Sequence, residues 1–186
     1  MPSEIEHPAL MKVHLMVLQH GLWGTPYNLE ELELEIEKRS CEAIVARGEK
    51  MNSKVSKDGL PTEVRIFNSH SSFFVRESSS ATMDGIDTCG ERLFDCVKGH
   101  IEMLRELEGE EVTHISMVGY SLGGLITRYA VGKMETEGWF DEGKFTPINF
   151  MTIATPHLGV WKNPSKSLPP VGTSLFLVWP PSQVSS

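Results

Sequence analysis

Four short apolar runs lie along the chain, and longer segments with apolar residues at helical spacing separate them. The runs cover residues 13–18, 63–67, 113–118 and 148–153. Those at 13–18, 113–118 and 148–153 are short and nearly continuous, which is typical of strands buried in a parallel sheet. The run at 63–67 alternates more, and it predicts a shorter strand of the same sheet.

The segments between these runs have the 3.6-residue period of amphipathic helices. We expect helices over residues 28–39, 86–107 and 122–138, with residues 40–61 as a surface loop. Asn28 is the expected N-cap of the first helix, with Glu31 at the capping-box position, and Asp84 or Asp87 is expected to cap the second. The alternation of strand and helix predicts the α/β class, with a mostly parallel sheet, right-handed crossovers and flanking helices.

At 186 residues, the chain is long enough for one domain and short for two. We divide it into a polar lead-in at residues 1–10, an α/β domain at 11–160 and a proline-rich irregular tail at 161–186. Between the second strand and the second helix lies a serine-rich loop over residues 68–82. In that loop, Phe73 and Phe74 either line an apolar pocket or only plug the loop.

Charge and cysteine content exclude several classes of function. The net charge of −8 repels nucleic-acid phosphate and anionic lipid, so we expect no nucleic-acid partner. Cys41, Cys89 and Cys96 form no zinc-type spacing and are expected to be free thiols, and we predict no metal and no cofactor. No basic leader and no membrane-length apolar run is visible, which predicts a cytoplasmic protein still able to touch a membrane surface.

The strongest chemical signal is a serine between glycines, where the third apolar run meets the third helix. Residues 118–124 read V-G-Y-S-L-G-G. A sharp strand-to-helix turn needs glycine at positions 119 and 123, and it leaves the Ser121 hydroxyl exposed at the strand end, beside helix N–H groups able to stabilise an oxyanion. The alternative is that Ser121 is only a helix N-cap and that the glycines serve close packing.

A second signal follows the first apolar run, where residues 19–24 read Q-H-G-L-W-G. This loop is expected to turn backbone N–H groups, such as that of Leu22, toward the space above the sheet. The alternative is a simple turn formed by Gly21 and Gly24, with Trp23 as a hydrophobic plug.

Taken together, these motifs resemble the α/β-hydrolase superfamily and, within it, the lipase-like serine esterases of the DUF676 family, fungal members in particular. The matching stretches are residues 20–24 (H-G-L-W-G), 84–93 (D-G-I-D-T-C-G-E-R-L), 121–130 (S-L-G-G-L-I-T-R-Y-A) and 154–159 (A-T-P-H-L-G). Four motifs in family order are far more specific than one. The chain departs slightly from the family at Tyr120, where members commonly have histidine.

The resemblance implies hydrolysis of acyl esters, with a glycerolipid or phospholipid substrate. Ser121 maps to the nucleophile, and the backbone N–H groups of Leu122 and Leu22 map to the oxyanion hole. His20, Gly21 and Tyr120 are expected to border the substrate site, and His157 is expected at the pocket edge rather than as the base. Contact with a membrane or lipid-droplet surface fits this substrate class.

The catalytic set nevertheless looks incomplete. A serine hydroxyl needs an adjacent base, and in this superfamily the acid and the histidine follow on later strands. No histidine follows His157, and the only aspartate after the serine, Asp141, is expected at the opposite end of the sheet. We therefore expect a C-terminally truncated hydrolase that turns over esters poorly. A non-catalytic lipid- or protein-binding fragment is the alternative.

Overall fold

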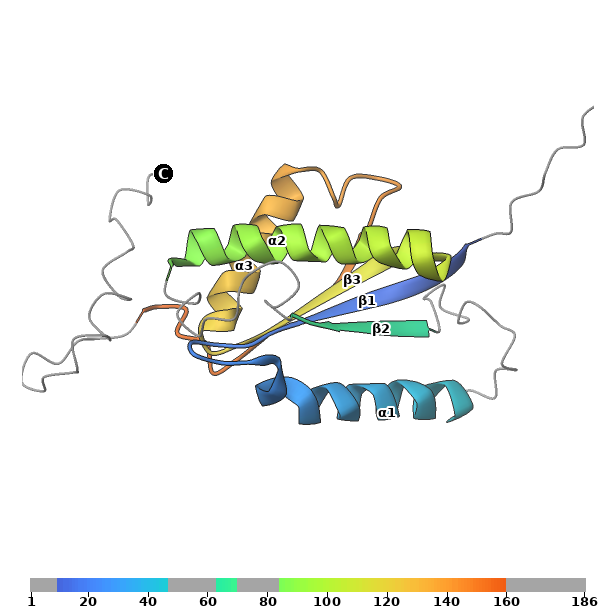
Figure 1. Cartoon of the computed structure of the whole chain (residues 1–186), viewed down its shortest axis with the longest axis horizontal. Coiled ribbons are helices and arrows are strands. Elements are labelled where there is room, and N and C mark those ends of the chain that lie inside the picture. Colours follow the sequence, from blue (N-terminus) through green and yellow to red (C-terminus); the bar gives the residue numbers. More distant parts are fainter. Residues whose placement is uncertain (1–9, 47–62, 70–83, 160–186) are drawn as a thin grey trace, which may run out of the picture.

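The computed structural model describes residues 10–46, 63–69 and 84–159, and it contains a four-stranded parallel sheet with helices on both faces (Figure 1). The predicted strands and α-helices are matched in number and order, since every predicted apolar run is a strand. The elements are β1 (Met11–Gln19), a 3-10 turn η1 (Pro26–Leu29), α1 (Glu30–Ala46), β2 (Glu63–Asn68), α2 (Ile86–Met103), a π-helical turn η3 (Leu104–Glu108), β3 (Glu110–Tyr120), α3 (Leu122–Thr136) and β4 (Thr146–Ile153).

The strand order is β2-β1-β3-β4, and each neighbouring pair runs parallel. Helix α1 lies on one face of the sheet, whereas α2 and α3 lie on the other (Figure 1). Because all four strands point the same way, the loops after β1 and β3 emerge side by side at one end of the sheet. The predicted α/β fold, with a parallel sheet and flanking helices, is confirmed.

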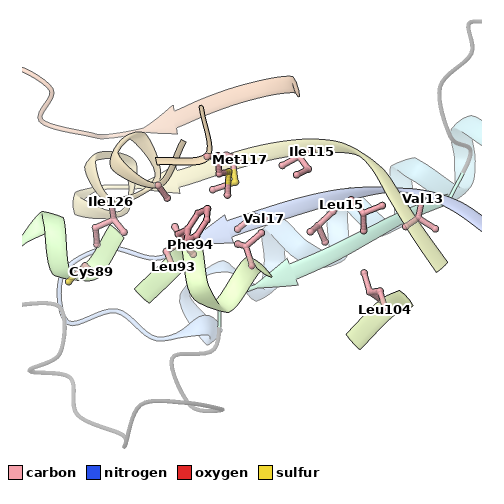
Figure 2. Close-up of a cluster of buried hydrophobic side chains, with 14 of the residues drawn as sticks. Val13, Leu15, Val17, Cys89, Leu93, Phe94, Leu104, Ile115, Met117 and Ile126 are labelled. Atoms are coloured by element: carbon pink, nitrogen blue, oxygen red, sulfur yellow. The ribbon is translucent and has the colours of Figure 1, made fainter. Parts of the chain in front are cut away.

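The main core lies between the sheet and the helices α2 and α3 (Figure 2). Alternate residues of β1, namely Val13, Leu15 and Val17, point into it and are fully buried. A smaller core on the opposite face joins Leu18 and Val118 to Leu29. Both faces of the two central strands are therefore covered, which explains why their sequences are almost continuously apolar.

Two predicted boundaries are wrong. Helix α1 continues to Ala46, seven residues beyond its expected end, because no glycine or proline interrupts the sequence before Gly48. Strand β3 begins at Glu110 rather than Thr113, since Glu110 is 4% exposed and its carboxylate accepts hydrogen bonds from the Arg65 guanidinium of β2. This ion pair joins the two strands that flank β1.

The predicted helix caps are also wrong. Asn28 lies inside η1, where its side-chain oxygen accepts a hydrogen bond of 2.7 Å from the backbone N–H of Thr25. Helix α2 begins after Gly85, whose φ of +106° favours glycine, and neither aspartate caps it through its side chain. Asp84 instead forms an ion pair with Arg92 at 2.6 Å.

Polar side chains also bridge β1 and β3, on the face that carries α1. The Ser116 hydroxyl lies 2.9 Å from His14 Nε2 and accepts a hydrogen bond from the backbone N–H of Asn149 in β4. Burial, assisted by nearby His114, lowers the pKa of His14 to about 4.

The outer strand β4 is only partly covered by the described residues. Phe150 and Met151 are 47% and 54% exposed, and they lie on opposite faces of the sheet because they are consecutive. Cys89 and Cys96 are not disulfide-bonded to each other, and burial raises the pKa of both thiols. Phe73, Phe74 and the predicted tail lie outside the described residues.

Candidate active site

Ser121 is the single residue between β3 and α3, and its backbone is fixed on both sides. Its φ and ψ are +55° and −125°, a conformation that L-residues rarely adopt. The Ser121 N–H donates to the carbonyl of Ile153 in β4 at 2.8 Å, and the Ser121 carbonyl accepts from the Gly124 N–H at 3.1 Å. Such strain costs about 1–3 kcal/mol and persists only where the surrounding structure enforces it.

The glycines around Ser121 allow backbone segments to approach more closely than any side chain permits. A Cβ atom at Gly119 would lie 2.4 Å from Gly124 Cα, and one at Gly123 would lie 2.4 Å from the carbonyl oxygens of Gln19 and His20. The prediction that both positions need glycine is confirmed. The contact at Gly123 also shows that the start of α3 packs directly against the end of β1.

The loop after β1 lies beside the Ser121 side chain. A Cβ atom at Gly21 would be 2.7 Å from Ser121 Cβ and 3.2 Å from Ser121 Oγ. Two hydrogen bonds fix this loop. The buried His20 ring donates from Nδ1 to the Gly21 carbonyl at 3.0 Å, and Gln19 Nε2 donates to the His20 carbonyl. Ser121 is itself only partly buried. The structure thus brings together the two motifs that the sequence singled out.

The same loop presents the aromatic side chain of Trp23, for which a hydrophobic plug was one of the two interpretations that the sequence left open. Gly24 N–H donates to the Gly21 carbonyl at 3.1 Å, which makes Leu22 and Trp23 the central residues of a tight turn. Trp23 has a φ of +53° at a position that favours glycine, and it is 54% exposed, so it does not plug the fold. Tyr120, just before the serine, is 42% exposed at the same end of the sheet. The only sequence signal for Trp23 was its place between two glycines.

Two segments beside Ser121 carry the backbone N–H groups that the sequence predicts as oxyanion donors. Leu122 opens α3, and the first N–H groups of a helix have no acceptor within the helix. Leu22 lies directly after Gly21, whose backbone touches Ser121. The arrangement therefore places a hydroxyl between a helix N-terminus and a loop with N–H groups, which suits stabilisation of a developing oxyanion.

The described residues place no base in hydrogen-bond contact with the Ser121 hydroxyl. His157 follows β4, is exposed, and has Nε2 2.9 Å from Thr152 Oγ1. Asp141 lies between α3 and β4, 3.8 Å from the Lys144 ammonium, at the opposite end of the sheet as predicted. Within residues 10–46, 63–69 and 84–159, no histidine ring is hydrogen-bonded to Ser121.

Metal sites and membrane-spanning helices are both absent from the described residues. Among them, no group of three His, Cys, Asp or Glu side chains is arranged to hold a metal ion. In the same part of the chain, no helix combines the length and apolarity needed to cross a membrane.

Comparison with known proteins identifies the family. Residues 10–176 match the family described as "Putative serine esterase (DUF676)". The chain is 30% identical over 166 residues to "Putative lipase ROG1" of Saccharomyces cerevisiae, which covers 86% of this chain and 19% of that protein. It is 28% identical over 150 residues to "Putative lipase YDL109C" of the same yeast, which covers 80% of this chain and 19% of that protein.

A shorter match covers one motif region of a third relative. "Putative lipase C4A8.10" of Schizosaccharomyces pombe is 50% identical over 50 residues, which is 26% of this chain and 6% of that protein. The chain thus spans about a fifth of the length of the two budding-yeast relatives. No solved structure matches it significantly. Motifs, fold and family match agree, and the chain belongs to the DUF676 family of serine esterases, whose relatives include proteins named as lipases.

Proposed function

We propose that Ser121 is the nucleophile of a serine esterase that acts on acyl esters of lipids. The observation that carries this proposal is the strained Ser121 backbone, at φ +55°, with Gly21 packed against the serine side chain. A bulky neighbour at position 21 would block the hydroxyl, whereas glycine leaves it open. Strain at a partly exposed nucleophilic side chain is the kind of outlier that marks functional sites.

The proposed chemistry is attack by Ser121 Oγ on the ester carbonyl carbon. The C–O π electrons move to the carbonyl oxygen, and the resulting oxyanion accepts hydrogen bonds from the N–H groups of Leu122 and Leu22. Collapse of this intermediate expels the alcohol and leaves an acyl-serine, which water then hydrolyses. Each oxyanion donor typically contributes about 3–4 kcal/mol to transition-state stabilisation.

Turnover by this chain alone is expected to be low. The Ser121 proton must pass to a base as the new C–O bond forms, and the described residues bring no histidine into hydrogen-bond contact with Ser121. Losing triad members leaves a residual enhancement of roughly 10³–10⁴ over water in enzymes that keep their oxyanion hole. We expect activity in that lower range.

Lipid esters are the proposed substrates, because apolar side chains are exposed at the same end of the sheet as Ser121. Trp23 and Tyr120 flank the serine loops, and Leu158, after β4, is fully exposed. These side chains suit contact with acyl chains or with the surface of a membrane or lipid droplet. The relatives named as lipases support the same class. We propose that four residues border this site, namely His20, Gly21, Tyr120 and His157.

Hydrolysis of p-nitrophenyl butyrate by the purified chain tests the proposal. We expect slow hydrolysis above the buffer rate that Ser121→Ala abolishes. Gly21→Ala should lower it, because the new Cβ would press on Ser121 Cβ and on the Tyr120 carbonyl at 2.9 Å. Gly132→Ala in α3 is the control, since a Cβ there meets nothing within 4 Å. Equal rates of hydrolysis by wild type and Ser121→Ala would contradict the assignment of Ser121 as the nucleophile. Robust turnover by wild type would contradict the expectation that this chain lacks a base to activate Ser121.

A second candidate function is lipid binding without catalysis, and the exposed apolar residues of β4 favour it. Phe150, Met151 and Ile153 are each more than a third exposed. Flotation with phosphatidylcholine vesicles separates the two functions. Binding that persists in Ser121→Ala, together with no ester hydrolysis by either protein, would favour the non-catalytic function.

A further inference from the structure

A groove of about 740 Å³ lies at the β2 edge of the sheet, away from Ser121. Its walls come from η1 and the start of α1 on one side and from the second half of α2 and η3 on the other, with Ile66, Phe67 and Asn68 of β2 between them. Since α1 and α2 cover opposite faces of the sheet (Figure 1), a groove lined by both opens at the edge. Among the described strands, β2 pairs only with β1, so its other edge faces this groove.

The groove has an apolar base. Phe67 stacks on the His100 ring, with the ring centroids 4.5 Å apart, and Ile66 packs into the smaller core beside it. Tyr27 and Leu107 are 75% and 77% exposed at opposite walls. Two large side chains on facing walls, both exposed, leave room for apolar groups of a ligand between them.

Charge in the groove is of one sign. Glu30 and Glu33 line one wall and Glu102 and Glu106 the other, whereas no Lys or Arg is among the described lining residues. Burial lowers the pKa of His100, which is therefore neutral near pH 7 and supplies no countercharge. The groove selects against anionic lipid and nucleic acid, and it favours a positively charged ligand.

One buried polar atom also lacks a partner. Asn68 Nδ2 donates to Glu33 Oε2 at 2.8 Å and to the Pro26 carbonyl at 3.0 Å. Asn68 Oδ1 is buried with no hydrogen-bond partner. A buried acceptor without a donor is costly, and a ligand N–H at the end of β2 would relieve that cost.

We propose that this groove binds an extended segment of a partner protein in which Lys or Arg alternates with bulky apolar side chains, lying along the free edge of β2. Strand addition supplies main-chain hydrogen bonds, and side chains of such a segment point alternately to opposite faces. Its apolar side chains face the wall with Phe67 and Leu107, so its cations face the opposite wall, which carries Glu30 and Glu33. The site shares no lining residue with the region around Ser121, so it is independent of the esterase proposal.

The test uses the whole chain and a fluorescein-labelled peptide, Lys-Val-Lys-Val-Lys-Val-Lys, in fluorescence anisotropy. We expect saturable binding that weakens as salt rises. The peptide Lys-Ser-Lys-Ser-Lys-Ser-Lys should bind at least about tenfold more weakly, because it lacks apolar contacts, and Glu-Val-Glu-Val-Glu-Val-Glu should not bind. No binding of the first peptide, or equal binding of the first two, would overturn the proposal. Equal competition by spermine would also overturn it, by showing a general cation surface.

Variants locate the binding in the groove. A side chain at Gly99 meets nothing within 4 Å, so Gly99→Leu fills the groove without disturbing α2, and we expect about tenfold weaker binding. Gly132→Leu on α3, where the space is equally open, is its control. Glu30→Gln combined with Glu33→Gln should weaken binding roughly threefold to tenfold, whereas Glu135→Gln should not. Equal effects in groove and control variants, with unchanged melting temperatures, would contradict the assignment.

Discussion

Gly119→Ala is the sharpest test of the close packing that creates the turn at Ser121. The new Cβ would lie 2.4 Å from Gly124 Cα, 2.6 Å from Gly124 N and 2.6 Å from the Gly123 carbonyl oxygen. All three are backbone atoms at the start of α3, so the methyl group has no flexible side chain to displace. Overpacking typically costs 1–3 kcal/mol, and rigid neighbours place this change at the upper end, near 3 kcal/mol.

A matched change in an open position provides the control. Gly132 lies in α3, and a Cβ there meets nothing within 4 Å, so Gly132→Ala should gain about 1 kcal/mol from helix propensity. For a chain of this length, 1 kcal/mol shifts Tm by roughly 2–4 °C. Thermal unfolding followed by circular dichroism should therefore show Gly119→Ala melting roughly 6–12 °C below wild type and Gly132→Ala roughly 2–4 °C above it. If Gly119→Ala melted as wild type does, the close approach of β3 and α3 would be refuted.

Two further predictions concern polar groups in the sheet. The native state keeps His14 neutral, with a pKa of about 4 against 6.5 when unfolded, so its contribution to stability is complete above pH 6.5 and is lost as the pH falls toward 4. His14→Gln should lose less stability than wild type between these pH values in urea unfolding, and parallel losses would contradict this. Arg65→Met should destabilise the chain by about 3 kcal/mol because it leaves the buried Glu110 carboxylate unpaired. Glu110→Gln should cost less, roughly 1 kcal/mol, because Arg65 is a third exposed and water can solvate it. A larger loss of stability for Glu110→Gln than for Arg65→Met in chemical denaturation would contradict this reasoning.

The sequence predicted the strands and the turn at Ser121 because both follow from local patterns. Apolar runs such as residues 13–18 are buried wherever the sheet places them, and glycines at 119 and 123 are needed by any sharp strand-to-helix turn. It could not predict the start of β3, since Glu110 joins the sheet through Arg65, which is 45 residues away in sequence. Such a partner is visible only after folding.

The predicted helix caps were wrong, and the exposure of Trp23 was left open, for a related reason. Whether Asn28 caps α1 depends on the direction in which the chain enters the helix, and here a turn beginning at Thr25 comes first. Trp23 lies in a turn closed by the hydrogen bond from the Gly24 N–H to the Gly21 carbonyl, with a φ of +53°, and such geometry is visible only in the folded loop. The groove beside β2 was also missed, because its walls come from segments far apart in the sequence.

Replacing the serine by cysteine tests the presentation of residue 121 without requiring a base. A thiol is nucleophilic at neutral pH, and a helix N-terminus lowers its pKa, so Ser121→Cys should react with iodoacetamide at least about tenfold faster than the other thiols. Burial raises the pKa of Cys89 and Cys96 and slows their reaction, and Ser121→Ala reports the background of all native cysteines. The account predicts one additional, fast-reacting thiol per chain, located at position 121 by mass spectrometry. A thiol at 121 that reacts no faster than Cys89 would contradict it.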